Sequence, residues 1–186
     1  MHAWRSVSGI MLADLLVSLA VLGLLLAGVF GVLHGSLKAY AWGVGRVDAQ
    51  QAARLALDRM ATELREAGYD PKGAGIEPVI VATPSSVTFQ RDLNGNGIID
   101  ATRERVTFVL RPGESVLRRD AGGGAQPIIN GVRRFSLTYL DGVGLTTTDP
   151  SRVAFVRIRV EVGLTGPTAV MLTDVLIRNR RERRLF

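Results

Sequence analysis

The sequence predicts an α+β protein in which one long N-terminal helix packs on a mostly antiparallel β-sheet head. Three observations lead to this prediction: an apolar stretch near the N-terminus, an amphipathic stretch directly after it, and a two-residue hydrophobic period from residue 79 onward. The chain has 186 residues, a formal net charge of +6 and no cysteine. A disulfide scaffold, a cysteine nucleophile and a cysteine zinc site are therefore excluded.

The apolar stretch covers residues 10–33, and 19 of its 24 residues are hydrophobic. A helix of that length extends about 36 Å, which is enough to cross the ~30 Å hydrocarbon layer of a bilayer. Asp14 is its one charged residue, and a carboxylate inside a membrane costs roughly 2.5–3.5 kcal/mol. We expect residues 10–33 to be the transmembrane half of the helix, with Asp14 either hydrated near the membrane face or paired within a bundle of helices.

The amphipathic stretch follows as residues 34–67. Apolar side chains recur there at three- and four-residue spacing from Ala49 to Ala67, which is typical of one buried helix face. The residues expected on the opposite, charged face are Arg54, Asp58, Glu63 and Arg65. Gly68 is expected to end the helix. The glycines within Gly31–Gly45 lower helix propensity, so local bending or melting is expected there.

The head is predicted to cover residues 68–178 and to consist mainly of strands. Seven segments alternate between apolar and polar residues or are bounded by Gly, Pro and Asp. They are Val79–Ala82, Val87–Arg91, Arg105–Leu110, Ser115–Arg119, Val132–Leu140, Val153–Val162 and Thr168–Arg178. Short connections favour antiparallel hairpins. We expect the sheet to bury one face against the apolar stripe of the helix.

Residues 9–20 read Gly-Ile-Met-Leu-Ala-Asp-Leu-Leu-Val-Ser-Leu-Ala. This stretch resembles the cleavage and methylation motif of type IV prepilins and type II secretion pseudopilins. The resemblance implies that residues 1–9 are a leader peptide, that a prepilin peptidase cuts between Gly9 and Ile10, and that the new amine of Ile10 is methylated. It also implies that Asp14 is an assembly carboxylate that pairs with the Ile10 amine of a neighbouring subunit. The family usually has phenylalanine after the cut and glutamate at the fifth mature position, where this chain has Ile10 and Asp14.

A second stretch, Leu57 to Pro71, ends in Glu-Ala-Gly-Tyr-Asp-Pro. It resembles the region of PilW-type minor pilins where the helix enters the head. The resemblance implies a minor pilin that is stored in the inner membrane as a single-pass protein, with its head in the periplasm, before it enters a pilus fibre. The partners implied are other pilins, contacted through the helix, and the prepilin peptidase. A J-like pseudopilin of type II secretion is the alternative, because it shares this architecture.

The loop between residues 92 and 100 is the best candidate for a ligand site in the head. Oxygen-bearing side chains at alternate positions, followed by glycine, match the first half of an EF-hand-like calcium loop. The candidate calcium ligands are Asp92, Asn94, Asn96, Asp100 and the carbonyl of Ile98. The match ends there, because Arg103 stands where a bidentate glutamate is expected and Glu104 comes one residue late. A plain hairpin tip is the alternative, since Asn-Gly is a strong turn signal and occurs twice.

Catalysis is not expected. The two histidines are His2 and His34, so the head contains neither histidine nor cysteine. Mechanisms based on Ser-His, Cys-His or histidine-rich metal sites are thereby excluded for the head. Residues 179–186 form a basic tail for which a solvated end is the usual role. No aromatic platform accompanies its charge, so nucleic acid is not an expected partner, and a pilus-associated module that binds DNA or a surface is a further alternative.

Overall fold

The computed structural model describes residues 8–163 and 168–179, and it describes residues 8–11 by their backbone only. The chain divides into two compact units, Met1–Val44 and Gly45–Phe186. The predicted cleavage site at Gly9 and Ile10 has helical backbone, and its side chains lie outside the description. The leader residues 1–7 and residues 180–186 of the basic tail also lie outside the described residues.

Helix α1 spans Ser8–Arg65 and contains 58 residues. Its backbone stays helical through Gly31–Gly45, so the melting expected there does not occur. Each glycine weakens a helix by only about 1 kcal/mol, and the residues between these glycines include good helix formers. A Cβ added at Gly31 or Gly43 would meet no atom within 4 Å, so close packing does not explain the glycines.

The first unit contains the part of α1 that ends at Val44. Every described side chain from Leu12 to Val44 is exposed, although most of them are apolar. By length and composition, this part of the chain holds a helix that could cross a membrane. The segment that was expected to cross a membrane is thus an unburied apolar helix.

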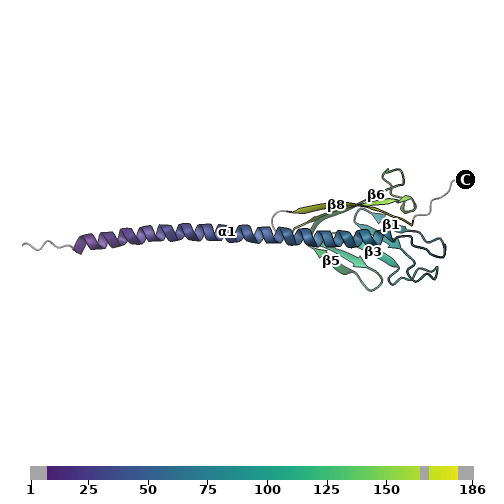
Figure 1. Ribbon diagram of the computed structural model, residues 1–186, viewed down its shortest axis with the longest axis horizontal. Helices are drawn as coiled ribbons and strands as arrows, with labels where there is room; N and C mark the ends of the chain where they lie inside the picture. The colour runs from purple at the N-terminus through teal and green to yellow at the C-terminus, as the bar shows by residue number, and fades with distance from the viewer. Residues whose placement is uncertain (1–7, 164–167, 180–186) are drawn as a thin grey trace, which may run out of the picture. The chain divides into compact units, whose positions relative to one another are not determined.

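The second unit contains two antiparallel sheets (Figure 1). The five-stranded sheet has the order β1 (Val79–Thr83), β2 (Ser86–Gln90), β3 (Arg105–Leu110), β4 (Val116–Asp120) and β5 (Gln126–Asn130). The three-stranded sheet has the order β6 (Val132–Leu140), β7 (Phe155–Val162) and β8 (Ala169–Leu176). A short 3₁₀ helix, η1 (Pro150–Arg152), precedes β7. Seven strands overlap predicted segments, with ends that differ by up to two residues, and β5 is the described strand that the sequence pattern did not indicate.

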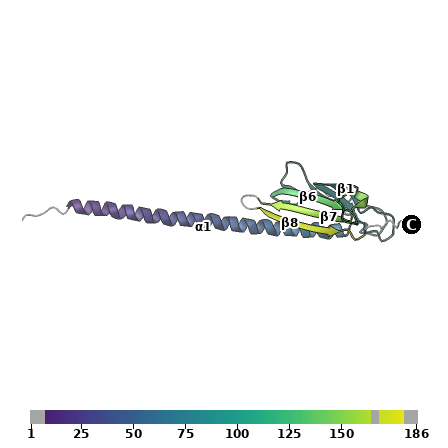
Figure 2. The same cartoon turned by 90° about the horizontal axis from the view of Figure 1, so that it is seen from above.

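One hydrophobic core joins the end of α1 to both sheets. Figure 2 shows strands β6, β7 and β8 beside the C-terminal part of α1. The helix residues in this core are Ala53, Ala56, Leu57, Met60, Ala61 and Leu64. The five-stranded sheet contributes Phe89 and Phe108, whose rings stack with centroids 6.1 Å apart. The three-stranded sheet contributes Val156 and Ile158, which are completely buried. The α+β packing predicted from the apolar stripe is therefore confirmed.

The turn after α1 depends on Gly68. The helix ends at Arg65, two residues before the predicted end, and Gly68 adopts a left-handed φ of 76°. Its N–H donates to the Gln90 carbonyl at 2.8 Å, and an added Cβ would lie 2.6 Å from the Pro78 side chain. Only glycine fits this combination of backbone angle and close approach. The turn thereby fixes the helix end against the end of β2.

Candidate functional site

The carboxylate of Asp14 is an exposed charge on the apolar part of α1. Ser18 donates its hydroxyl to the Asp14 carbonyl at 2.8 Å, so this serine is satisfied within the helix. Within the described part of the chain, no group donates a hydrogen bond to the Asp14 carboxylate. If this segment lies in lipid, the carboxylate needs either water or a cation from another molecule.

The apolar part of α1 ends in residues that favour a membrane surface. The ammonium of Lys38 lies over the Trp42 ring, 5.2 Å from its centroid, and Tyr40 is exposed nearby in the sequence. Lysine, tryptophan and tyrosine are enriched where a helix leaves the hydrocarbon layer. This cluster therefore marks a suitable boundary between apolar and aqueous surroundings, a few residues beyond the predicted end of the span at residue 33.

In the head, the loop after β2 is organised around Asp92, which is fully buried. One carboxylate oxygen accepts the N–H groups of Gly95 and Asn96 at 2.7 and 3.2 Å. The other accepts the N–H of Gly97 at 2.8 Å. The backbone of Asp92 also donates to the Tyr69 carbonyl at 2.8 Å, which ties the loop to the turn after α1. The loop is thus closed by an internal carboxylate.

Glu104, which comes one residue late for a calcium loop, is the second carboxylate that holds this loop. Its carboxylate accepts the N–H groups of Leu93 and Asn94 on one oxygen and that of Asp100 on the other, at 2.9, 3.1 and 2.9 Å. The preceding Arg103 has a left-handed φ of 76°. Non-glycine residues rarely adopt this conformation, and here it accompanies the inward placement of a nearly buried Glu104.

Hydrogen bonds link three of the candidate calcium ligands, Asn94, Asn96 and Asp100. Among the described hydrogen bonds, none links the carbonyl of Ile98 to them. Asn94 donates its side-chain amide to Asp100 at 3.1 Å, and the Asn94 oxygen accepts the N–H of Asn96 at 2.8 Å. The Asn96 oxygen in turn accepts the N–H of Ile98 at 2.7 Å. Among the described residues, no three His, Cys, Asp or Glu side chains form a group that could hold a metal ion. Calcium binding by this loop stays a prediction, alongside the hairpin-tip interpretation.

A buried ion cluster joins α1 to the five-stranded sheet. Glu63 is 9% exposed, and its two oxygens accept from the Arg119 Nε at 2.8 and 2.9 Å. Arg59 donates to the same carboxylate at 3.1 Å, and Arg91 lies 3.7 Å from it and also pairs with Glu66. The expectation that Glu63 lies on the charged outer face is wrong, because these arginines draw it into the helix–sheet contact. Its position one turn from Arg59 and next to Leu64 was the available signal.

A hollow of about 670 Å³ borders this cluster. It is lined by Arg91, Leu93, Asn94, Asp100, Thr102, Arg103, Glu104, Arg119 and Ala121. Arg119 pairs with Glu63 and Arg91 pairs with Glu66, so two of the three guanidinium groups are already neutralised. The Nε of Arg91 has no hydrogen-bond partner among the described groups, but it is buried and out of reach of a molecule in the hollow. The cluster is therefore best suited to hold the helix on the sheet.

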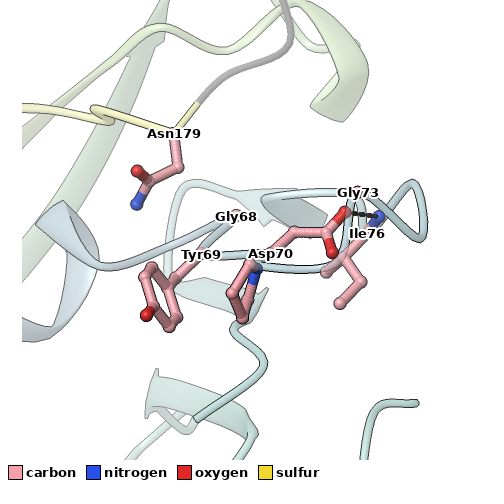
Figure 3. Close-up of a pocket in the computed structure, with 7 residues that line it drawn as sticks. Gly68, Tyr69, Asp70, Gly73, Ile76 and Asn179 are labelled. Atoms are coloured by element: carbon pink, nitrogen blue, oxygen red, sulfur yellow. Dashed lines mark hydrogen bonds between the residues drawn. The ribbon is translucent and has the colours of Figure 1, made fainter. Parts of the chain in front are cut away.

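A second hollow, of about 320 Å³, lies at the turn after α1 (Figure 3). Figure 3 shows the Asp70 carboxylate turned toward Ile76. It accepts the N–H groups of Ala74, Gly75 and Ile76 at 2.9, 2.8 and 3.3 Å. Burial raises the pKa of Asp70, but the backbone N–H donors together outweigh it and hold the pKa below its ordinary value of 3.8. An ionised carboxylate with its oxygens already engaged shapes the turn and is a poor general base.

No family model matches the chain, and no curated protein sequence matches it.

Proposed function

We propose that this protein is a minor pilin, a structural subunit that primes or modifies the assembly of a type IV pilus. One observation carries the proposal: a prepilin-like Gly9–Ile10 junction makes Asp14 the fifth mature residue of an exposed apolar helix, and its carboxylate has no partner among the described residues. The PilW-like stretch that ends at Pro71 supports the same proposal. Under this proposal, the inner membrane holds the subunit by its apolar segment, with the head in the periplasm, until the subunit enters the fibre.

Assembly would use the two polar groups at the start of the mature helix. Cutting after Gly9 gives Ile10 a free amine, and methylation keeps that amine positively charged. Each apolar helix then offers one cation and one anion, Asp14, to its neighbours, and pairing of opposite charges in a medium of low polarity is strongly favoured over leaving either one alone. The apolar side chains supply lateral packing, and the ion pair fixes the register between subunits.

The proposal assigns no catalytic role to the chain. The head contains no histidine or cysteine, and the carboxylates of Glu63, Asp92 and Glu104 are committed to backbone N–H groups or to arginines. A J-like pseudopilin shares the proposed chemistry. A deletion strain distinguishes the two, because loss of pili with normal protein export indicates a pilin, and loss of export indicates a pseudopilin.

The Asp14 pairing is tested by following Asp14→Ala in cells. We expect the variant to enter the membrane fraction as the wild type does and to be depleted from sheared fibres, because its helix can still insert but cannot neutralise a neighbour's amine. Asp14→Glu is the matched control and should restore incorporation, since it keeps the charge. Normal incorporation of Asp14→Ala would contradict the pairing.

Processing is tested independently by mass spectrometry of the purified chain. The wild type should lack residues 1–9 and carry a methyl group on Ile10, whereas Gly9→Val should keep the leader. Gly23→Val is the control, because this glycine lies in the same helix with open space around it. An uncut wild-type chain would count against the prepilin assignment even if Asp14 proved important.

A further inference from the structure

The two sheets of the head have four edge strands, and three of these edges are protected. Unprotected edges expose a row of backbone N–H and C=O groups that pairs readily with another strand. Strand β1 is short, its pairing with β2 shifts register between Val79 and Val81, and η1 packs beside it. Strand β5 contains Pro127, which has no N–H, and its pairing with β4 also shifts register, at Leu117 and Arg118.

The edge of β6 is covered by other parts of the head. The N–H of Leu137 donates to the Pro84 carbonyl at 2.8 Å, in the turn between β1 and β2. The carbonyl of Tyr139 accepts the N–H of Thr147 at 2.9 Å, from the loop after β6. The hydroxyl of Tyr139 adds bonds to the carbonyls of Thr83 and Ser86. Outward backbone groups of β6 are therefore already hydrogen-bonded within the head.

Among the described residues, strand β8 has none of these protections. It is eight residues long, contains no proline, and pairs with β7 in one uninterrupted register. Ile177 donates its N–H to the Ala154 carbonyl at 2.9 Å in the continuation of that register. Because alternate residues of an antiparallel strand face the same neighbour, the odd-numbered residues of β8 bond to β7. The outward backbone groups belong to Val170, Leu172, Asp174 and Leu176, and within the described part of the chain no other element bonds to them.

The side chains of these same residues form an apolar row on the outer face of the sheet. Val170, Leu172 and Leu176 are 52%, 60% and 48% exposed. The row is interrupted by Asp174, which pairs with Arg157 of β7 through two bonds of 2.8 Å. A bare backbone edge beside an exposed apolar row is the combination that peptide-binding sheets use, with backbone bonds for affinity and alternate side chains for selectivity.

We propose that β8 binds an extended strand of another polypeptide chain, which adds a fourth strand to the β6–β7–β8 sheet. The bound strand carries apolar side chains opposite Val170, Leu172 and Leu176. It carries no carboxylate opposite Asp174, because like charges directly across a strand pair are destabilising. This binding site uses the head alone and holds whether or not the chain is a pilin.

The probe is a fluorescent peptide as long as β8 in which valine alternates with threonine or lysine. It is titrated against the full chain in detergent micelles, and saturable binding is expected from fluorescence anisotropy. Hydrogen exchange followed by NMR should slow at the amides of Val170, Leu172, Asp174 and Leu176 and stay unchanged at Thr173. A control peptide of the same sequence with methylated backbone nitrogens should not bind, because it cannot form the ladder.

Two variants separate strand addition from simple apolar contact. Leu172→Pro removes one outward N–H without removing a bond to β7, so the head should keep its circular dichroism spectrum while peptide affinity falls at least about tenfold. Leu172→Ala keeps the N–H and should weaken binding less. Equal losses in the two variants, or equal binding of the methylated peptide, would overturn the proposal. The methylated control decides the question even if Leu172→Pro unfolds.

Two further outcomes would also overturn it. One is the absence of saturable binding by the unmethylated peptide. The other is a dimer in peptide-free solution that Leu172→Pro abolishes, because the edge would then belong to a second copy of this chain.

Discussion

At the scale of single residues, Glu63 is the charge that links α1 to the five-stranded sheet beside the hydrophobic core. Its carboxylate lies in the helix–sheet interface and accepts bonds from Arg59 and Arg119. Removing a carboxylate from such a site leaves arginines buried without their partner, which costs more than the ion pair itself contributes. The cluster therefore fixes the helix in one position on the sheet.

We expect Glu63→Ala to lower the free energy of unfolding by about 3 kcal/mol. Urea unfolding followed by circular dichroism measures this loss. Asp58→Ala, on the exposed side of the same helix, is the control and should change the free energy by less than about 0.5 kcal/mol. Equal stability of the wild type and Glu63→Ala would show that the cluster contributes nothing.

The outer and inner positions of α1 in the head were predictable from the spacing of its apolar residues, but the location of Glu63 was not. Helical periodicity assigns a glutamate to the wet face because a lone charge is costly to bury. The arginines that remove this cost, Arg91 and Arg119, lie far along the chain. Arg59, one turn before Glu63, is a local sign of the cluster, but the pairing with the two distant arginines leaves no local pattern. Glu104 was unpredictable for another reason: its partners are close in the sequence, but its role in the loop depends on the backbone angle of Arg103.

At the scale of elements, the loop between β2 and β3 is held by two carboxylates that face its backbone N–H groups. Asp92→Asn replaces an acceptor oxygen with an N–H₂ group that must face another donor. We expect this variant to lose about 2 kcal/mol of stability, both in calcium and in chelator, as measured by thermal melting. Unchanged melting of Asp92→Asn would contradict this account of the loop.

The same melting experiment tests whether the loop binds calcium. A melting temperature of the wild type that rises with calcium, and no longer rises in Asp100→Ala, would show that the loop also binds the ion. Equal melting in calcium and in chelator would leave the hairpin tip as its sole role.

The loop after β6 is built around Asp141 and gives a prediction about pH. The N–H of Leu145 lowers the pKa of this buried carboxyl below its ordinary value of 3.8, burial opposes the shift, and the N–H of Val143 and the guanidinium of Arg152 add to it. A lowered pKa in the folded state stabilises the fold above pH 3.8, and this contribution is lost as the pH falls through the lowered pKa.

Between pH 7 and about pH 3, the wild type should therefore lose more stability than Asp141→Asn does. Melting curves across this range measure the difference. Asp58→Asn is the control, because this exposed side chain takes part in no described hydrogen bond. A pH profile of Asp141→Asn that parallels the wild type would contradict the prediction.

Strands with regular alternation were predictable from the sequence, and β5 shows where that approach fails. Its five residues include Pro127 and lie beside a glycine-rich connection, so they carry the signals of a loop. As an edge strand, β5 can accommodate a residue without an N–H, and Ile129 still reaches the core. These five residues form a strand because they lie at the edge of the sheet, and the local sequence gives no information about that position.

At the scale of the whole molecule, the buried core lies entirely within the second unit, Gly45–Phe186. We expect a chain that begins at Gly45 to be soluble without detergent and to melt within about 3 °C of the full chain, because truncation removes no core residue. The full chain should need detergent, since its apolar segment is exposed. Aggregation or early melting of the truncated chain would show that residues before Gly45 contribute to folding.

The single core shared by α1 and both sheets has a consequence for how the head unfolds. Neither sheet has a separate core, because the buried side chains of both sheets and of α1 belong to one hydrophobic cluster. Loss of one sheet would expose the apolar face of the other to water. Denaturation of the head should therefore be all-or-none, with coincident midpoints for a probe in β3 and a probe in β7.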